Sequence, residues 1–110
     1  MDSYIVLDLE WNQSPNGREY SNKDIPFEII EIGALKLNCD LEIVDEFHRV
    51  VKPTVYKKMH FKVHEVVQIG IGELKRKGVP FVEAINDFYR FCEIDDRNKK
   101  KIICTWGNLD

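Results

Sequence analysis

The sequence lacks the features of membrane-bound, exported and disulfide-stabilised proteins. None of its 110 residues belongs to an apolar run long enough to cross a bilayer, and no basic region followed by an apolar stretch opens the chain. The three cysteines form no C-x-x-C pair, so neither a disulfide framework nor a zinc knuckle is expected. With 44% hydrophobic and 32% charged residues, the chain is expected to form one small globular domain in the cytoplasm, without a membrane partner.

Two carboxylates follow an apolar run near the N-terminus. Asp8 and Glu10 come directly after residues 4–7, and the alternation of side chains along a strand places both on one face of a sheet. An edge strand that reaches water could also end in acids. The wholly apolar run favours a central strand, where two unpaired anions on one face would repel each other. We therefore expect a cation between Asp8 and Glu10.

Positive charge is concentrated in the middle of a chain whose net charge is −3. Residues 1–51 hold 11 acidic and 4 basic residues, whereas residues 52–77, here called the basic segment, hold 2 acidic and 7 basic residues. Its lysines and arginine are interleaved with Tyr56, His60, Phe61 and His64. Cations neutralise phosphates and rings stack on bases, so this composition indicates a nucleic-acid partner; a solvated lysine-rich loop is the alternative.

The hydrophobic patterns predict an α/β domain with the principal element order β-β-β-α-β. The expected elements are a strand at residues 4–9, a polar loop at 12–26, an antiparallel hairpin at 27–37 and 41–51, a short helix within 62–76, an amphipathic helix after Pro80 and a strand at 102–105. The last strand should run parallel to the first, because a helix connects them.

A further acid, Asp110, lies just past the last expected strand. Ligands of open α/β sheets collect at the carboxyl ends of the strands. Asp8, Glu10 and Asp110 are therefore expected to converge on one metal site.

Four sequence blocks, taken in their order along the chain, resemble the motifs of a known protein family. They are YIVLDLEWN at residues 4–12, FEIIEIGA at 27–34, PFVEA at 80–84 and TWGNLD at 105–110. Together they resemble the proofreading-type DEDD 3′-to-5′ exonuclease superfamily, and within it the DEDDh branch. The resemblance implies a ribonuclease-H-like mixed sheet, here truncated after the fourth strand.

The resemblance also implies roles for individual residues. Asp8 would bridge two divalent cations, Glu10 would bind one of them near the terminal 3′-hydroxyl, and Asp110 would help hold the other. Oxygen ligands suit Mg²⁺ or Mn²⁺. Trp11 and Asn12 would contact the terminal nucleotide, although Trp11 could equally be a core residue.

The chain departs from the family pattern after its second motif. Members carry a fourth metal-binding Asp, preceded by a His or Tyr that acts as general base, and both lie downstream of the residue that Asp110 matches. Since His48, His60 and His64 all precede Asp110, the general base stays unassigned. We expect residues 1–110 to be the N-terminal portion of a single exonuclease domain, with the last motif absent. Exposed apolar surface and self-association as a homo-oligomer should follow.

The expected function is metal-dependent 3′-to-5′ hydrolysis of phosphodiesters at the 3′ end of single-stranded RNA or DNA. The alternative is a catalytically inactive regulatory or nucleic-acid-binding module on the same fold. A ribonuclease-H-like enzyme that cuts internally fits the motifs less well. The motifs do not separate RNA from DNA, because recognition of the 2′-hydroxyl depends on contacts that they do not encode.

Overall fold

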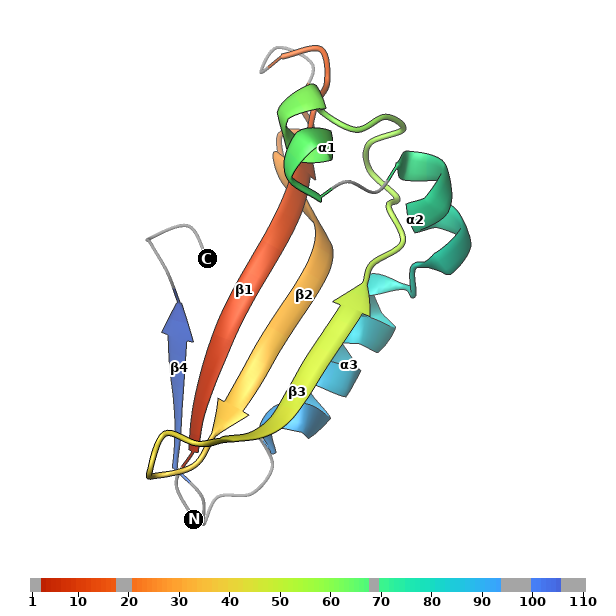
Figure 1. Ribbon diagram of the computed structural model, residues 1–110. Coiled ribbons are helices and arrows are strands. Elements are labelled where there is room, and N and C mark those ends of the chain that lie inside the picture. Colours follow the sequence, from red (N-terminus) through yellow and green to blue (C-terminus); the bar gives the residue numbers. More distant parts are fainter. Residues whose placement is uncertain (1–2, 18–20, 68–69, 94–99, 106–110) are drawn as a thin grey trace.

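Three β-rich segments near the N-terminus and one near the C-terminus form a mixed sheet with a helix packed on one face (Figure 1). The computed structural model describes residues 3–17, 21–67, 70–93 and 100–105. The elements in these ranges are β1 (Ser3–Gln13), β2 (Phe27–Leu37), β3 (Ile43–Val50), α1 (Phe61–Val67), α2 (Ile71–Lys77), α3 (Phe81–Cys92) and β4 (Lys101–Thr105).

The strand order is β3-β2-β1-β4 across the described part of the sheet. Strand β2 pairs antiparallel with both β1 and β3, whereas β4 pairs parallel with β1. The expected antiparallel hairpin and the parallel last strand are thus confirmed, and β1 is a central strand. Its position fits the apolar run that precedes Asp8.

The elements differ from the sequence-based expectation mainly at the end of β1, at the start of β3 and between β3 and Pro80, and by single residues elsewhere. Strand β1 continues to Gln13, because Trp11, Asn12 and Gln13 still pair with β2 beyond an irregularity after Glu10. Strand β3 begins two residues late, at Ile43, because the Asn38 side chain accepts backbone N–H groups in the turn before it. One short helix was expected between the hairpin and Pro80, but α1 and α2 are separate helices and Gly70 is the N-cap residue of α2.

The core lies between α3 and one face of the sheet. Ile5, Ile32 and Phe47 point from the three antiparallel strands toward the buried helix residues Ala84 and Cys92. The Phe47 ring lies 5.6 Å from the Phe88 ring and 5.3 Å from the Phe91 ring, measured between centroids. Burial raises the pKa of the Cys92 thiol, as expected for a core residue.

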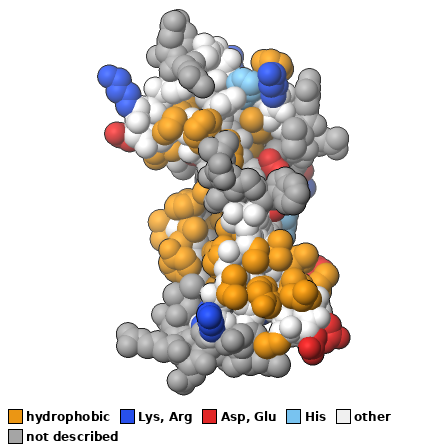
Figure 2. Space-filling model, turned by 90° about the vertical axis from the view of Figure 1, so that its left-hand side faces the viewer, with side chains coloured by type: hydrophobic (Ala, Val, Ile, Leu, Met, Phe, Trp, Pro, Cys, Tyr) orange, Lys and Arg blue, Asp and Glu red, His pale blue; other side chains and the backbone are white. Residues whose placement is uncertain are grey.

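The opposite face of the sheet carries the alternate residues of each strand. Val6 on this face is partly exposed, as are Ile102 and Ile103 on the edge strand β4. Figure 2 views the molecule from the β4 side and shows hydrophobic side chains gathered on the surface there. No helix within the described ranges is long and apolar enough to cross a membrane.

We expect Gly78→Ala to lower the free energy of unfolding by about 1–3 kcal/mol. Gly78 follows α2 with an ordinary φ of −71°, but a Cβ there would lie 2.5 Å from the Leu74 carbonyl oxygen and 2.6 Å from the Lys52 nitrogen. Backbone atoms must therefore move to admit a methyl group. Gly72→Ala is the matched control, because nothing lies within 4 Å of its added Cβ.

At position 72, within α2, alanine should stabilise the helix by up to about 1 kcal/mol relative to glycine. Urea denaturation of both variants measures the difference. Equal stability of Gly78→Ala and the wild type would contradict the close approach of α2 to Lys52.

Candidate functional site

Asp8 and Glu10 lie on the sheet face opposite α3. Leu7 and Leu9, which alternate with them, pack against the core, so the two acids project from the other side. Asp8 is opposite Gly33 on β2, and Glu10 is opposite Glu31. The Asp8 side chain is exposed and Glu10 is half-buried. The shared face predicted for this pair is therefore the face that α3 leaves uncovered.

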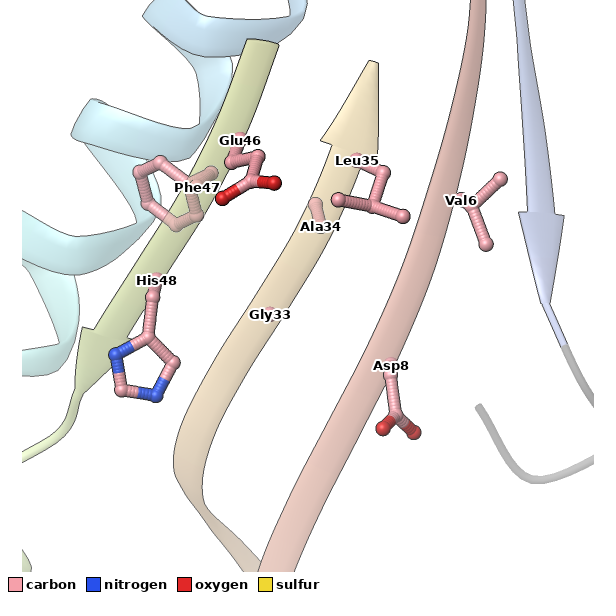
Figure 3. Close-up of a pocket in the computed structure, with 8 residues that line it drawn as sticks. All are labelled: Val6, Asp8, Gly33, Ala34, Leu35, Glu46, Phe47 and His48. Carbon is pink, nitrogen blue, oxygen red and sulfur yellow. The ribbon is translucent and has the colours of Figure 1, made fainter. Parts of the chain in front are cut away.

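An open hollow lies beside Asp8. Figure 3 shows Asp8 and His48 on either side of Gly33, which has no side chain to fill the space between them. Val6, Leu35, Glu46 and Phe47 also line the hollow, whose volume is about 540 Å³. A second hollow, of about 450 Å³, separates Asp8 from Cys104 and Thr105 on β4. The Asp8 side chain is thus exposed to solvent on the side of β2 and on the side of β4.

Glu31 and His48 are joined by a side-chain hydrogen bond next to these acids. The His48 Nε2 atom lies 2.9 Å from the Glu31 Oε1 atom, across strands β2 and β3. Glu10 and Glu31 are direct cross-strand neighbours, and like charges in such positions repel. Because β1 and β3 flank β2 on opposite sides, the bond to His48 directs the Glu31 carboxylate away from Glu10.

The position of His48 near Asp8 was not predicted from the sequence. The signal was present in the alternation of β3: Phe47 is a core residue, so Glu46 and His48 must point to the opposite face, where Asp8 lies. What the sequence did not give was the register, which sets Asp8, Gly33 and His48 in one row across three strands.

Trp11 and Asn12, the residues expected to contact substrate, have different surroundings. The Trp11 ring is half-buried and lies 5.9 Å from the Phe27 ring, at the ends of β1 and β2. Asn12 is fully buried. Its Nδ2 donates to the Lys58 carbonyl oxygen at 2.9 Å and its Oδ1 accepts the His60 N–H at 2.8 Å, so the side chain holds the basic segment against β1.

Some side chains of the basic segment are exposed to solvent, and others are buried. Tyr56 is buried and its hydroxyl donates to the Ile25 carbonyl oxygen at 2.7 Å, which removes its ring from the surface. Phe61 is 64% exposed and its ring stacks on that of His60, with 4.7 Å between centroids. Lys57 and Lys58 are exposed. This part of the segment lies beside the carboxyl end of β1, next to α1 (Figure 1).

The remaining basic side chains of the segment lie mainly on α2. There the Lys77 ammonium group donates to Glu73 at 2.9 Å, and this hydrogen bond, with the attraction between the charges, lowers the pKa of the Glu73 carboxyl. Lys75 and Arg76 are exposed on the same helix.

The expected metal site lies only partly within the described ranges. Within those ranges, no group of three His, Cys, Asp or Glu side chains is arranged to hold a metal ion. Asp110, the expected third ligand, and the neighbouring Trp106 lie outside the described residues. The two carboxylates of β1 supply oxygen donors on one open face, and this donor chemistry fits a hard divalent cation.

Comparisons with known proteins identify the family. A family model for exonucleases of the RNase T type matches residues 5–110. The nuclease domain of 3′hExo, a DEDDh family member bound to rAMP, superposes with a TM-score of 0.76 at 20% identity, over 99% of this chain and 54% of that one. A 3′-exonuclease that recognises the 3′ end of the histone mRNA stem-loop gives a TM-score of 0.76 at 21% identity, over 99% and 37% of the two chains.

A further solved structure, Escherichia coli exonuclease I with a dT13 oligonucleotide, gives a TM-score of 0.71 at 11% identity, over 96% of this chain and 20% of that one. No curated protein sequence matches the chain. The chain spans between 20% and 54% of the length of these three solved proteins. Given the family match over residues 5–110 and the shared fold, the protein belongs to the exonuclease family and has the ribonuclease-H-like fold of DEDDh 3′-exonucleases.

Proposed function

We propose that the chain carries the N-terminal part of a metal-dependent exonuclease site that hydrolyses phosphodiesters at the 3′ end of single-stranded RNA or DNA. The observation that carries the proposal is the position of Asp8 and Glu10 on the uncovered sheet face, beside the basic and aromatic surface at the end of β1. The solved relatives with bound rAMP and dT13 support a single-stranded ligand.

In this proposal Asp8, Glu10 and Asp110 hold two divalent cations, Mg²⁺ or Mn²⁺. When bound, such cations supply an activated water and neutralise charge on the leaving 3′-oxygen. Without them, the carboxylates would repel a phosphodiester. The hydrogen bond with His48 keeps the Glu31 carboxylate directed away from Glu10, so Glu31 would act on the site through its charge rather than as a ligand.

Substrate contacts in this proposal come from the carboxyl end of β1. Trp11 would stack on the terminal base, since its half-buried ring lies at the end of β1 and does not belong to the core cluster. Asn12 would act through the basic segment that it holds. The general base stays unassigned: Nε2 of His48 is paired with Glu31, and Nδ1 of His60 accepts the Lys62 N–H at 3.2 Å.

The proposal predicts that a chelator abolishes the release of mononucleotides. A 5′-labelled single-stranded oligonucleotide should be shortened stepwise from its 3′ end with Mg²⁺ or Mn²⁺, and EDTA should stop the reaction until excess metal is restored. Circular dichroism with and without EDTA is the control, because loss of folded structure would give the same result. Metal-independent shortening, or internal cuts in a circular substrate, would contradict the proposal.

The second candidate function is a catalytically inactive regulatory or nucleic-acid-binding module. The exposed Lys57 and Lys58 and the stacked rings of His60 and Phe61 at the end of β1 would serve binding whether or not cleavage follows. Tight binding of the labelled oligonucleotide without product in either metal would support it. Self-association of the chain and a cytoplasmic location stay predictions, and the similar structures do not support oligomerisation. The choice between RNA and DNA also stays open to experiment.

A further inference from the structure

Residues 52–60, here called the arm, follow β3 and form neither helix nor strand, yet they are held along their whole length. At the start of the arm, the Lys52 N–H donates to the Val79 carbonyl oxygen at 2.8 Å. Further along, the backbone is bound by two buried polar side chains, Glu28 and Asn12. Buried polar groups are unfavourable unless they are hydrogen-bonded, so these contacts define the conformation of the arm.

Glu28 holds the middle of the arm. Its side chain is 8% exposed, and its Oε2 atom accepts the Thr54 N–H at 2.7 Å and the Val55 N–H at 2.9 Å. The Oε1 atom accepts the Tyr56 N–H at 3.3 Å. A carboxylate that accepts several backbone N–H groups forms strong, charge-assisted hydrogen bonds. The residues directly before Lys57 are therefore fixed.

Asn12 holds the end of the arm, through the Lys58 carbonyl oxygen and the His60 N–H. Asn12 and Glu28 are themselves cross-strand partners in the β1–β2 pair, two residues beyond Glu10. The two anchors thus occupy one position of the sheet and fix the arm on both sides of Lys57. Strand β1 therefore carries Asp8 and Glu10 as well as Asn12, one of the two anchors of the arm.

The side chains between the anchors are suited to a polyanion. Lys57 and Lys58 are exposed, and the stacked rings of His60 and Phe61 follow directly. A flexible arm would lose conformational freedom on binding a strand, whereas an arm already fixed by Glu28 and Asn12 would not. The arm is a preformed basic surface beside the carboxyl end of β1.

We propose that Glu28 and Asn12 are positioning residues for nucleic-acid binding, which hold Lys57 and Lys58 against the phosphates of a single strand whose 3′ end reaches Asp8 and Glu10. The inference rests on the proposed function for the direction of the strand. Its test uses binding without cleavage, so the two can fail separately.

The test is the salt dependence of oligonucleotide binding by the full chain in EDTA, measured by fluorescence anisotropy with a labelled dT oligomer. Glu28→Gln and Asn12→Ala should each weaken binding roughly tenfold, and the slope of log K against log salt should fall by up to about 1.4, the value for two phosphate contacts on a single strand. Glu83→Gln and Asn86→Ala are the matched controls, because both residues are exposed on α3. They should change neither quantity.

The double variant Lys57→Ala/Lys58→Ala separates positioning from folding, since it leaves both anchors intact. It should reproduce the loss of slope, and adding Glu28→Gln to it should cause little further loss. Hydrogen exchange at Thr54 and Val55 should accelerate in Glu28→Gln and stay unchanged in the lysine variant.

Wild-type affinity and slope in the lysine variant, or in folded anchor variants, would overturn the inference. Binding with the expected slopes but without mononucleotide release in Mg²⁺ or Mn²⁺ would leave the inference standing and favour the binding module over catalysis by this chain.

Discussion

Replacing Asp8 by asparagine is expected to reduce exonuclease activity at least about 10³-fold, equivalent to about 4 kcal/mol of transition-state stabilisation. Asparagine keeps the size of the side chain but removes the negative charge with which Asp8 would hold a divalent cation in the proposed site. The Asp8 side chain is exposed beside two open hollows, so the change should leave the fold intact. It should even relieve repulsion with Glu10 on the same face.

The measurement is kcat/KM for shortening of a 5′-labelled single-stranded oligonucleotide, with saturating Mn²⁺ and with Mg²⁺. Asp40→Asn provides the matched control, because Asp40 is an exposed aspartate in the turn between β2 and β3, far along the chain from the acids of β1. The control should keep wild-type activity. Activity of Asp8→Asn within a few fold of wild type would remove the acids of β1 from the mechanism.

Ile5→Ala is expected to have the largest effect on stability, a loss of about 2–5 kcal/mol in the free energy of unfolding. Ile5 is fully buried in the central strand, between Lys36 of β2 and Ile103 of β4, and it packs in the core beneath α3. Removing three carbon atoms there leaves a cavity that the flanking strands cannot readily close. A small domain has a total stability of about 5–15 kcal/mol, so this loss would leave little margin.

Ile43→Ala is the control for this prediction. Ile43 is 58% exposed at the start of the edge strand β3, and its truncation should change stability by less than about 0.5 kcal/mol. Urea denaturation followed by circular dichroism gives both values. If the two variants lost the same stability, the burial pattern of β1 would be wrong.

Local patterns in the sequence were sufficient for the elements of the fold. Strand β2 has the predicted bounds because isoleucine and phenylalanine are frequent in its 11 residues, which lie between a proline and a turn. Helix α3 follows Pro80 because its apolar residues recur at helical spacing. In the segment between them, the pattern was too weak to separate α1 from α2, since glycines at 70 and 72 interrupt it.

The surroundings of the candidate site were less predictable. The paired carboxylates of β1 were found from the sequence, because a period of two places residues 8 and 10 on one face whatever the partner strands are. The hydrogen bond between Glu31 and His48 could not be found in this way. It joins residues on different strands, and a shift of one residue in the register of β3 would turn His48 to the opposite face.

Asn12 shows most clearly the difference between what local sequence patterns predict and what long-range contacts decide. Its place after the acids suggested contact with a nucleotide, but its amide is fully buried and bound to the backbone at Lys58 and His60, more than 40 positions away in the chain. Periodicity and composition, which are local properties, established the α/β class, the face shared by Asp8 and Glu10 and the basic character of residues 52–77. The anchoring of those lysines beside the acids required strand register and long-range hydrogen bonds, which form only when distant segments pack together.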